Sequence, residues 1–259
     1  MAELGTRIRI GGVTDMSTID WYGNVSLVVF WAGCNIMCPY CHNSPLIPLD
    51  SGTEVDLHYL GERLKQGLSP VPSLDAVVFT GGEPLLQPDA VIEAAKLVKQ
   101  YNLKLMLDTN GTIADAVEKT LKTGLFDRVA LDVKSPLNPE AFGKLSGVPE
   151  MAEKYVASIK YTIKLSNELG IPIEARTTVA PGVSDGEEYI RKIARGIKGK
   201  TDVYYLQQFD NLGDVLDPEL KEKTPPAKEQ MIQLAKAAID EGVFPVYIKT
   251  RFDGLEMIK

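Results

Sequence analysis

Short apolar runs rich in β-branched residues alternate with segments of helical periodicity along most of this chain. The runs are continuously apolar rather than alternating, which is typical of strands buried on both faces. The predicted strands are 25–31, 76–80, 103–108, 128–134, 171–178, 203–208 and 244–250. The predicted helices lie near 54–66, 88–101, 113–124, 150–169, 186–198 and 226–241. This repetition predicts an α/β fold of parallel strands joined by right-handed crossovers.

The number of βα units favours part of a TIM-type barrel. A full barrel of eight units needs about 250 residues, and roughly 24 of the 259 residues precede the first predicted strand. We therefore predict a partial (β/α)6–7 barrel, with 1–24 as a lead-in, 25–250 as the barrel and 251–259 as a C-terminal tail. No low-complexity or Pro/Ser-rich linker interrupts the sequence, so 1–259 is expected to form a single domain.

Charge and hydropathy limit the partners of the chain. There are 35 acidic and 28 basic residues, a net charge of −7. Since no excess of Lys and Arg is present to bind a phosphate backbone, no nucleic-acid partner is expected. No apolar run approaches the roughly 18 residues of a membrane span. The first ten residues carry charges and lack the apolar core of a signal peptide, so a cytoplasmic location is expected.

The three cysteines of the chain follow directly on the first predicted strand. In barrel folds, catalytic groups lie at this end of the strands. Cys34, Cys38 and Cys41 have the spacing C-x₃-C-x₂-C, and there is no fourth cysteine. Thiolates this close in sequence can bind one metal centre from a single loop.

Three interpretations of this cysteine loop are open. The thiols could simply pack as small apolar groups. They could bind a structural zinc ion with His42, although adjacent Cys41 and His42 would hardly both satisfy tetrahedral geometry. They could bind a [4Fe–4S] cluster, which normally takes four thiolates. Three thiolates would leave one iron free to bind a small molecule, and the spacing favours this third interpretation.

Polar residues after the other predicted strands follow the same rule. Two glycines at 81 and 82 would let the backbone approach a ligand closely, although an ordinary turn before a helix would also explain them. Charged residues inside an apolar run, as at 132 and 134, are costly unless they are partnered. The segments are Gly81-Gly82-Glu83-Pro84, Asp108-Thr109-Asn110-Gly111, Asp132-Val133-Lys134, 174–182 and Gln207-Gln208-Phe209-Asp210. We interpret them as a ring of polar groups around an open iron.

The cysteine motif with Tyr40, followed by Gly81-Gly82-Glu83-Pro84, resembles the radical S-adenosylmethionine superfamily. Further segments resemble its glycyl-radical-enzyme activases, and the similarity covers about residues 8–258. These segments are 19–23, 41–43, 107–111, 176–179, 247–251 and 254–256. Within that group the chain is most similar to the long-form activating proteins of anaerobic ribonucleoside-triphosphate reductase.

The resemblance implies roles for the matching residues. Cys34, Cys38 and Cys41 would bind the [4Fe–4S] cluster, and the amine and carboxylate of S-adenosylmethionine would bind its open iron. Cofactor contacts are implied for Tyr40 near the adenine, for Gly81, Gly82 and Glu83 at the methionyl amine, for Lys134 and Arg176 toward the carboxylate and ribose, and for Pro84, Asp108, Asn110 and Thr178. Asp108, Thr109 and Asp132 match positions that hold a monovalent cation in pyruvate formate-lyase activases. His42 is expected to hydrogen-bond beside the cluster rather than to bind it.

The implied activity is reductive cleavage of S-adenosylmethionine to methionine and a 5′-deoxyadenosyl radical, which takes a hydrogen atom from a glycine of a partner enzyme. The implied partners are a glycyl radical enzyme, anaerobic ribonucleotide reductase first, and a low-potential electron donor such as flavodoxin or ferredoxin. Asp210 stands where the lyase activases carry a histidine, which favours the reductase. The alternatives are a lyase activase, a radical enzyme acting on a small molecule, and a non-catalytic zinc-binding protein.

Overall fold

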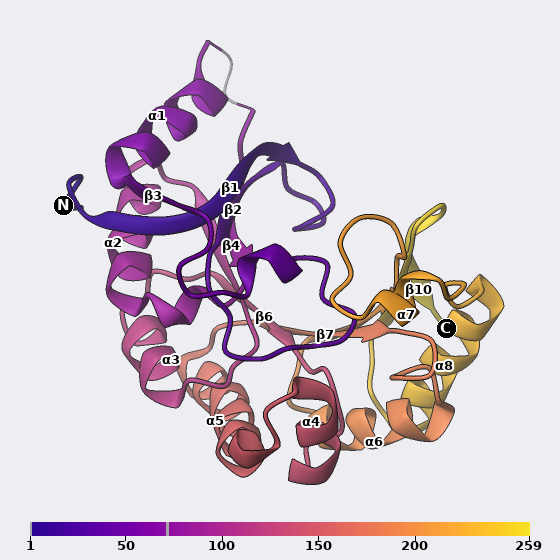
Figure 1. Ribbon diagram of the computed structural model, residues 1–259. Coiled ribbons are helices and arrows are strands. Elements are labelled where there is room, and N and C mark those ends of the chain that lie inside the picture. Colours follow the sequence, from indigo (N-terminus) through magenta and orange to yellow (C-terminus); the bar gives the residue numbers. More distant parts are fainter. Residues whose placement is uncertain (1, 71–72) are drawn as a thin grey trace. The chain divides into compact units, whose positions relative to one another are not determined.

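The computed structural model describes residues 2–70 and 73–259, which divide into two compact units (Figure 1). The first unit comprises Met1–Asn35, Pro45–Thr109 and Ile113–Val129. The second comprises Ile36–Ser44, Asn110–Thr112 and Ala130–Lys259. The division falls inside the cysteine loop, so each unit carries some of the predicted site residues.

The first unit contains a sheet with three parallel strands and two antiparallel ones. Strand β2 pairs in parallel with β4, which pairs in parallel with β5. Strand β1 is antiparallel to both β2 and β3. Their bounds are β1 Arg7–Ser17, β2 Ser26–Trp31, β3 Thr53–Asp56, β4 Ala76–Gly81 and β5 Lys104–Thr109. The continuous apolar runs of β2 and β4 are almost wholly buried, as strands covered on both faces should be.

Three helices form a row beside this sheet (Figure 1). They are α1 (Leu57–Leu68), α2 (Pro88–Gln100) and α3 (Ala114–Leu121). Helix α1 begins where Asp56 accepts a hydrogen bond from the Tyr59 backbone N–H at 3.2 Å, an N-cap that satisfies one of the free donors of the first turn. The short 3₁₀ turn η2 (Pro84–Leu86) connects β4 to α2 and buries Pro84.

The second unit contains parallel strands β7 (Ile173–Val179), β8 (Val203–Gln208) and β9 (Val246–Thr250). Strand β10 (Gly254–Ile258) returns antiparallel to β9. The division between the units falls within β6 (Arg128–Asp132).

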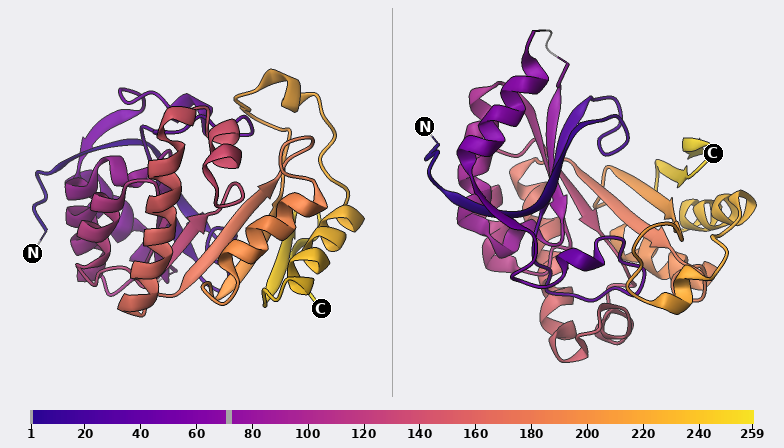
Figure 2. Two further views of the ribbon diagram at one scale, coloured as in Figure 1. Left: turned by 90° about the horizontal axis from the view of Figure 1, so that it is seen from below. Right: turned by 45° about the horizontal axis from the view of Figure 1, so that its top comes forward.

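The helices of the second unit are α4 (Pro139–Ser146), α5 (Ala152–Leu169), α6 (Glu187–Ile197), α7 (Pro218–Lys221) and α8 (Lys228–Asp240). The 3₁₀ turn η3 (Pro149–Met151) precedes α5, and η1 (Ser44–Leu46) ends the cysteine loop. Helices α6 and α8 lie side by side (Figure 2). An ion pair from Arg195 to Glu241 at 2.9 Å joins α6 to the residue that ends α8.

The α/β class with mostly parallel strands is confirmed, and each of the seven predicted strands is present. Strands β1, β3 and β10 were not predicted, and all three pair antiparallel. The predicted lead-in therefore contains a strand, β1, and the predicted tail contains another, β10. The assignment of 1–259 to one domain stays a prediction. Within the described residues, no helix has both the length and the apolar character needed to cross a membrane.

Candidate functional site

The end of β4 is hydrogen-bonded to the beginning of the cysteine loop within the first unit. The Glu83 backbone N–H donates to the Gly33 carbonyl oxygen at 2.7 Å. A Cβ on Gly82 would lie 2.0 Å from that oxygen, and a Cβ on Gly81 would lie 2.4 Å from the Trp31 backbone. Gly81 also has a φ of +118°, which L side chains rarely adopt. Both glycines are therefore required by close backbone approach, beyond the needs of an ordinary turn.

Side chains at the ends of β4 and β5 are joined to one another. The buried Glu83 carboxylate accepts hydrogen bonds from the Thr109 hydroxyl at 2.7 Å and the Leu85 N–H at 3.0 Å. The Asp108 carboxylate accepts one from the Thr80 hydroxyl at 2.8 Å. The structure thus brings together Glu83 and Thr109, two of the residues predicted from sequence, and places Asp108 against Thr80 on the same two neighbouring segments.

The cysteine loop is held by backbone hydrogen bonds in both units. In the first unit, the half-buried Cys34 donates its N–H to Ile47 O at 3.0 Å. In the second unit, the Cys41 N–H donates to the carbonyl of the buried Cys38 at 3.0 Å, which closes a tight turn. The Met37 N–H donates to Ser146 O at the end of α4 at 2.7 Å. The backbone of the cysteine loop is thus held in place within each unit.

Tyr40 lies in the same turn and is buried, with 4% of its surface exposed. Its hydroxyl has no hydrogen-bond partner among the described residues. Burial, and then the neighbouring Cys38, raise the pKa of Tyr40 well above its ordinary value. Leaving a buried hydroxyl unpaired costs about 1–3 kcal/mol, so this is a position where a bound ligand would gain a polar contact.

Lys134 forms an ion pair with Asp132 at 2.6 Å in the second unit. Asp132 is the last residue of β6, and Lys134 follows two positions later. Burial by itself would lower the pKa of Lys134, but Asp132, Cys38 and Tyr40 together raise it well above its ordinary value. Lys134 is therefore a half-buried cation beside Asp132, and the hydroxyl of Tyr189 donates a hydrogen bond to its backbone carbonyl at 3.1 Å.

Arg176 on β7 repeats this arrangement with Glu174, two residues before it. The Arg176 Nε–H donates to Glu174 Oε1 at 2.7 Å, and both side chains are nearly buried, 11% and 4% exposed. Farther along the strand, the Thr178 carbonyl accepts a hydrogen bond from the Ser184 hydroxyl at 2.6 Å. Burial of the pair holds the guanidinium in one orientation.

Asn110 begins a turn of its own in the second unit. Its Oδ1 accepts hydrogen bonds from the Thr112 N–H at 3.0 Å and the Thr112 hydroxyl at 2.6 Å. The Gly111 carbonyl accepts one from the Ser158 hydroxyl on α5 at 2.8 Å. The Asn110 side-chain oxygen thus shapes the loop, as an Asn-Gly turn predicts.

His42 stacks on Phe209, with ring centroids 5.6 Å apart, and its Nε2 is hydrogen-bonded to the Asp210 carbonyl. The Asp210 carboxylate accepts from the Leu212 N–H at 2.9 Å and lies 3.4 Å from the Arg251 guanidinium. His42 therefore joins the cysteine loop to the end of β8 within the second unit.

Tyr189 is a supporting residue that was not predicted, and Glu174 was predicted only as part of the segment 174–182, without its pairing to Arg176. That pairing could have been found from sequence, because a buried arginine on a strand needs a carboxylate and position i−2 is on the same face. Tyr189 had no such signal, since its role depends on where α6 packs.

A model of the radical SAM superfamily matches residues 28–194 of this chain. A provisionally named glycyl-radical enzyme activating enzyme of Methanocaldococcus jannaschii is 36% identical over 231 residues, which cover 88% of this chain and 91% of the relative. The pyruvate formate-lyase-activating enzyme of Clostridium pasteurianum is 31% identical over 194 residues, covering 73% of this chain and 76% of that protein.

A likeness to solved structures supports the predicted architecture. A radical SAM methyltransferase from Sphaerobacter thermophilus superposes with a TM-score of 0.69 at 15% identity, covering 88% of this chain and 67% of that one. This likeness concerns the fold alone, and it bears out the partial TIM-type barrel.

Proposed function

Because this chain belongs to the radical S-adenosylmethionine superfamily, we propose that its cysteine loop and the polar ends of its strands form the active site of a glycyl-radical-enzyme activase. The chain is a radical S-adenosylmethionine enzyme homologous to glycyl-radical-enzyme activating enzymes. Enzymes of this superfamily use a [4Fe–4S] cluster and S-adenosylmethionine.

The residues present fit both groups. Three thiols without a disulfide are the ligand type of an iron–sulfur cluster. Among the described residues, no three His, Cys, Asp or Glu side chains are grouped so that they could bind a single metal ion. A [4Fe–4S] cluster does not require such a group, because each thiolate binds a different iron. The Tyr40 hydroxyl, which has no partner among the described residues, offers a polar contact to an adenosyl group, and the half-buried Lys134 offers a cation to a carboxylate.

Each proposed contact has a physical reason. Cys34, Cys38 and Cys41 would hold the cluster, which with bound S-adenosylmethionine supplies reductive cleavage to methionine and a 5′-deoxyadenosyl radical. Gly81 and Gly82 have no side chains, so the backbone there can approach a ligand closely. Lys134 and Arg176 are held in place by their acidic partners, so little reorganisation is needed to orient a bound carboxylate or ribose. Pro84, Asn110 and Thr178 are proposed as further contacts of S-adenosylmethionine.

The partner we propose is an anaerobic ribonucleotide reductase, with reducing equivalents from a low-potential donor such as flavodoxin or ferredoxin. The observation that carries the activase assignment is the match to the M. jannaschii protein over 91% of its length. Asp210 in place of a histidine supports the reductase over pyruvate formate-lyase. The relative in C. pasteurianum makes the lyase the second candidate.

Deuterium transfer distinguishes these partners. We would label each partner with α-deuterated glycine and incubate it anaerobically with the reduced, cluster-loaded chain and S-adenosylmethionine. The reductase should yield 5′-deoxyadenosine that contains deuterium, and the lyase should not. If deuterium appears in 5′-deoxyadenosine only with the lyase, the partner is the lyase rather than the reductase. Unlabelled 5′-deoxyadenosine with both partners would favour a small-molecule substrate.

Tyr40→Phe is expected to weaken S-adenosylmethionine binding up to about tenfold, because a hydrogen bond contributes roughly 0.5–1.5 kcal/mol. Its melting temperature should not fall, since the Tyr40 hydroxyl has no partner among the described residues. Equilibrium binding and thermal melts of the same sample would check both points. A lower melting temperature with unchanged binding would show that the hydroxyl serves the fold instead.

Asp108→Ala and Asp132→Ala are expected to spare the cluster and to slow cofactor cleavage. We propose that Asp108, Thr109 and Asp132 hold a monovalent cation, in which case the rate should depend on the alkali ion supplied. Equal rates of cofactor cleavage in sodium, potassium and a bulky organic cation would contradict a bound cation. They would indicate that Lys134, which already forms an ion pair with Asp132, neutralises the charge of that carboxylate.

A further inference from the structure

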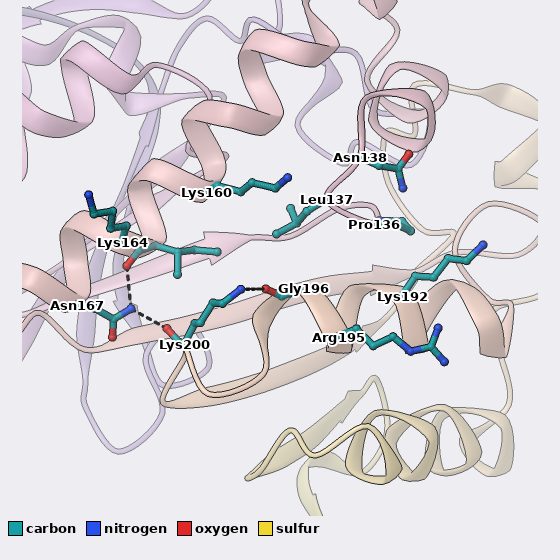
Figure 3. Close-up of a pocket in the computed structure, with 11 residues that line it drawn as sticks. Pro136, Leu137, Asn138, Lys160, Lys164, Asn167, Lys192, Arg195, Gly196 and Lys200 are labelled. Atoms are coloured by element: carbon teal, nitrogen blue, oxygen red, sulfur yellow. Dashed lines mark hydrogen bonds between the residues drawn. The ribbon is translucent and has the colours of Figure 1, made fainter.

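A cavity of about 630 Å³ lies in the second unit between α5, α6 and the loop that precedes α4 (Figure 3). None of its lining residues is among those to which we assign cluster or cofactor binding. Cavities of this size are typical of small-molecule sites in proteins. The cavity is therefore a second place where this chain could hold a ligand.

The charged residues that line this cavity all have one sign. Five of its eleven lining residues are Lys or Arg and none is Asp or Glu, although the chain as a whole has more acidic than basic residues. They are spaced along two helices and the segment after α6: Lys160, Lys164, Lys192, Arg195 and Lys200. A ring of cations favours an anion with several negative charges.

Two of these cations are the most available to a ligand. Among the described residues, neither Lys160 nor Lys192 forms an ion pair, although the pKa of Glu140 is lowered by Lys144 and, more weakly, by Lys192. Lys164 pairs with Glu168 at 3.5 Å, and Arg195 pairs with Glu188 and Glu241. The Lys200 ammonium group donates to Gly196 O at 2.9 Å, at the edge of the same cavity. Lys160 and Lys192, on opposite helices, would thus be the main charges that bind the anion.

The wall between the two helices is apolar. Leu137 lies between Lys160 of α5 and Gly196 of α6 in Figure 3, and the buried Pro136 and Ile163 complete this wall. The close approach of Leu137 depends on Gly196, where a Cβ would lie 3.3 Å from a Leu137 methyl group. An anion without an apolar part would leave this wall uncovered.

We propose that this cavity is a binding site for a nucleoside di- or triphosphate, with the phosphates at Lys160 and Lys192 and the base against Leu137. The shape is concave, as a small ligand requires, rather than flat, as an acidic protein partner would favour. This site is independent of the proposed activase reaction, because it uses no residue assigned to the cluster or to S-adenosylmethionine.

Titration calorimetry of the cluster-free full chain with ATP, tripolyphosphate and adenosine tests the proposal. We expect saturable binding of ATP, weaker binding of tripolyphosphate and still weaker binding of adenosine. Saturating S-adenosylhomocysteine should leave ATP binding unchanged. Displacement of ATP by S-adenosylhomocysteine, or equal affinity for ATP and tripolyphosphate, would overturn the proposal.

Two variants with the same change of charge locate the site. The double variant K160Q/K192Q should weaken ATP binding about tenfold, since each exposed ion pair contributes up to roughly 1 kcal/mol. The double variant K154Q/K236Q removes two exposed lysines outside the cavity and should bind like the parent. Leu137→Ala should weaken binding of ATP but not of tripolyphosphate. Unchanged ATP affinity in K160Q/K192Q would contradict the proposal. The proposal would also be wrong if the parent does not bind ATP but binds an acidic electron-transfer protein, and K160Q/K192Q loses that binding.

Discussion

Replacing any one of Cys34, Cys38 and Cys41 by alanine is expected to abolish both cluster assembly and cofactor cleavage. The chain has no fourth cysteine that could substitute for a lost ligand. Anaerobic reconstitution followed by iron and sulfide analysis measures the first effect, and chromatography of 5′-deoxyadenosine measures the second.

A neighbouring substitution separates this loss from damage to the loop. Met37→Leu changes an exposed side chain next to Cys38 and should keep a full cluster and full activity. A cysteine variant that retained four irons per chain and cleaved S-adenosylmethionine at the parent rate would refute the ligand assignment.

Gly82→Ala should slow cofactor cleavage by about 10- to 100-fold. The new Cβ would lie 2.0 Å from the Gly33 carbonyl oxygen, so the end of β4 and the start of the cysteine loop must separate. Overpacking of this kind costs about 1–3 kcal/mol, and here the distortion falls on the proposed cofactor contacts. The rate of 5′-deoxyadenosine formation at saturating dithionite measures it.

The matched control is Gly61→Ala, within α1. There the nearest atom to a new Cβ is 3.9 Å away, on Leu97. Alanine in a helix interior stabilises by about 0.5–1 kcal/mol over glycine, so this variant should be at least as stable as the parent and equally active. A Gly82→Ala enzyme as fast as Gly61→Ala would show that the close approach has no part in catalysis.

The parallel strands were predictable because each is a continuous apolar run. The antiparallel strands β1 and β10 were not, because they contain no continuous buried apolar run and most of their residues are only partly buried or exposed. Such strands depend on a neighbouring strand for stability. Helix α4 was missed despite clear signals. Asn138 caps its first turn, Pro139 is its first residue, and Gly147 ends it in the left-handed conformation.

The candidate site was predictable where chemistry is concentrated in a short segment, as in the cysteine loop and Gly81-Gly82-Glu83-Pro84. The partners of its charged residues were harder to predict. The contact of Thr109 with Glu83 joins the end of β5 to the segment after β4. The two residues are 26 positions apart, and only the fold brings them together. The cavity between α5 and α6 had no sequence signal, because its cations are spaced like those of an ordinary solvated helix face.

Electron paramagnetic resonance of the partner tests the central claim most directly. The reduced chain, S-adenosylmethionine and an anaerobic ribonucleotide reductase should give a doublet, because one α-hydrogen remains on a glycyl radical. Changing the radical-bearing glycine of the reductase to alanine should remove the doublet. If 5′-deoxyadenosine accumulates with a small metabolite while no doublet forms with the reductase or with pyruvate formate-lyase, the chain is not a glycyl-radical-enzyme activase.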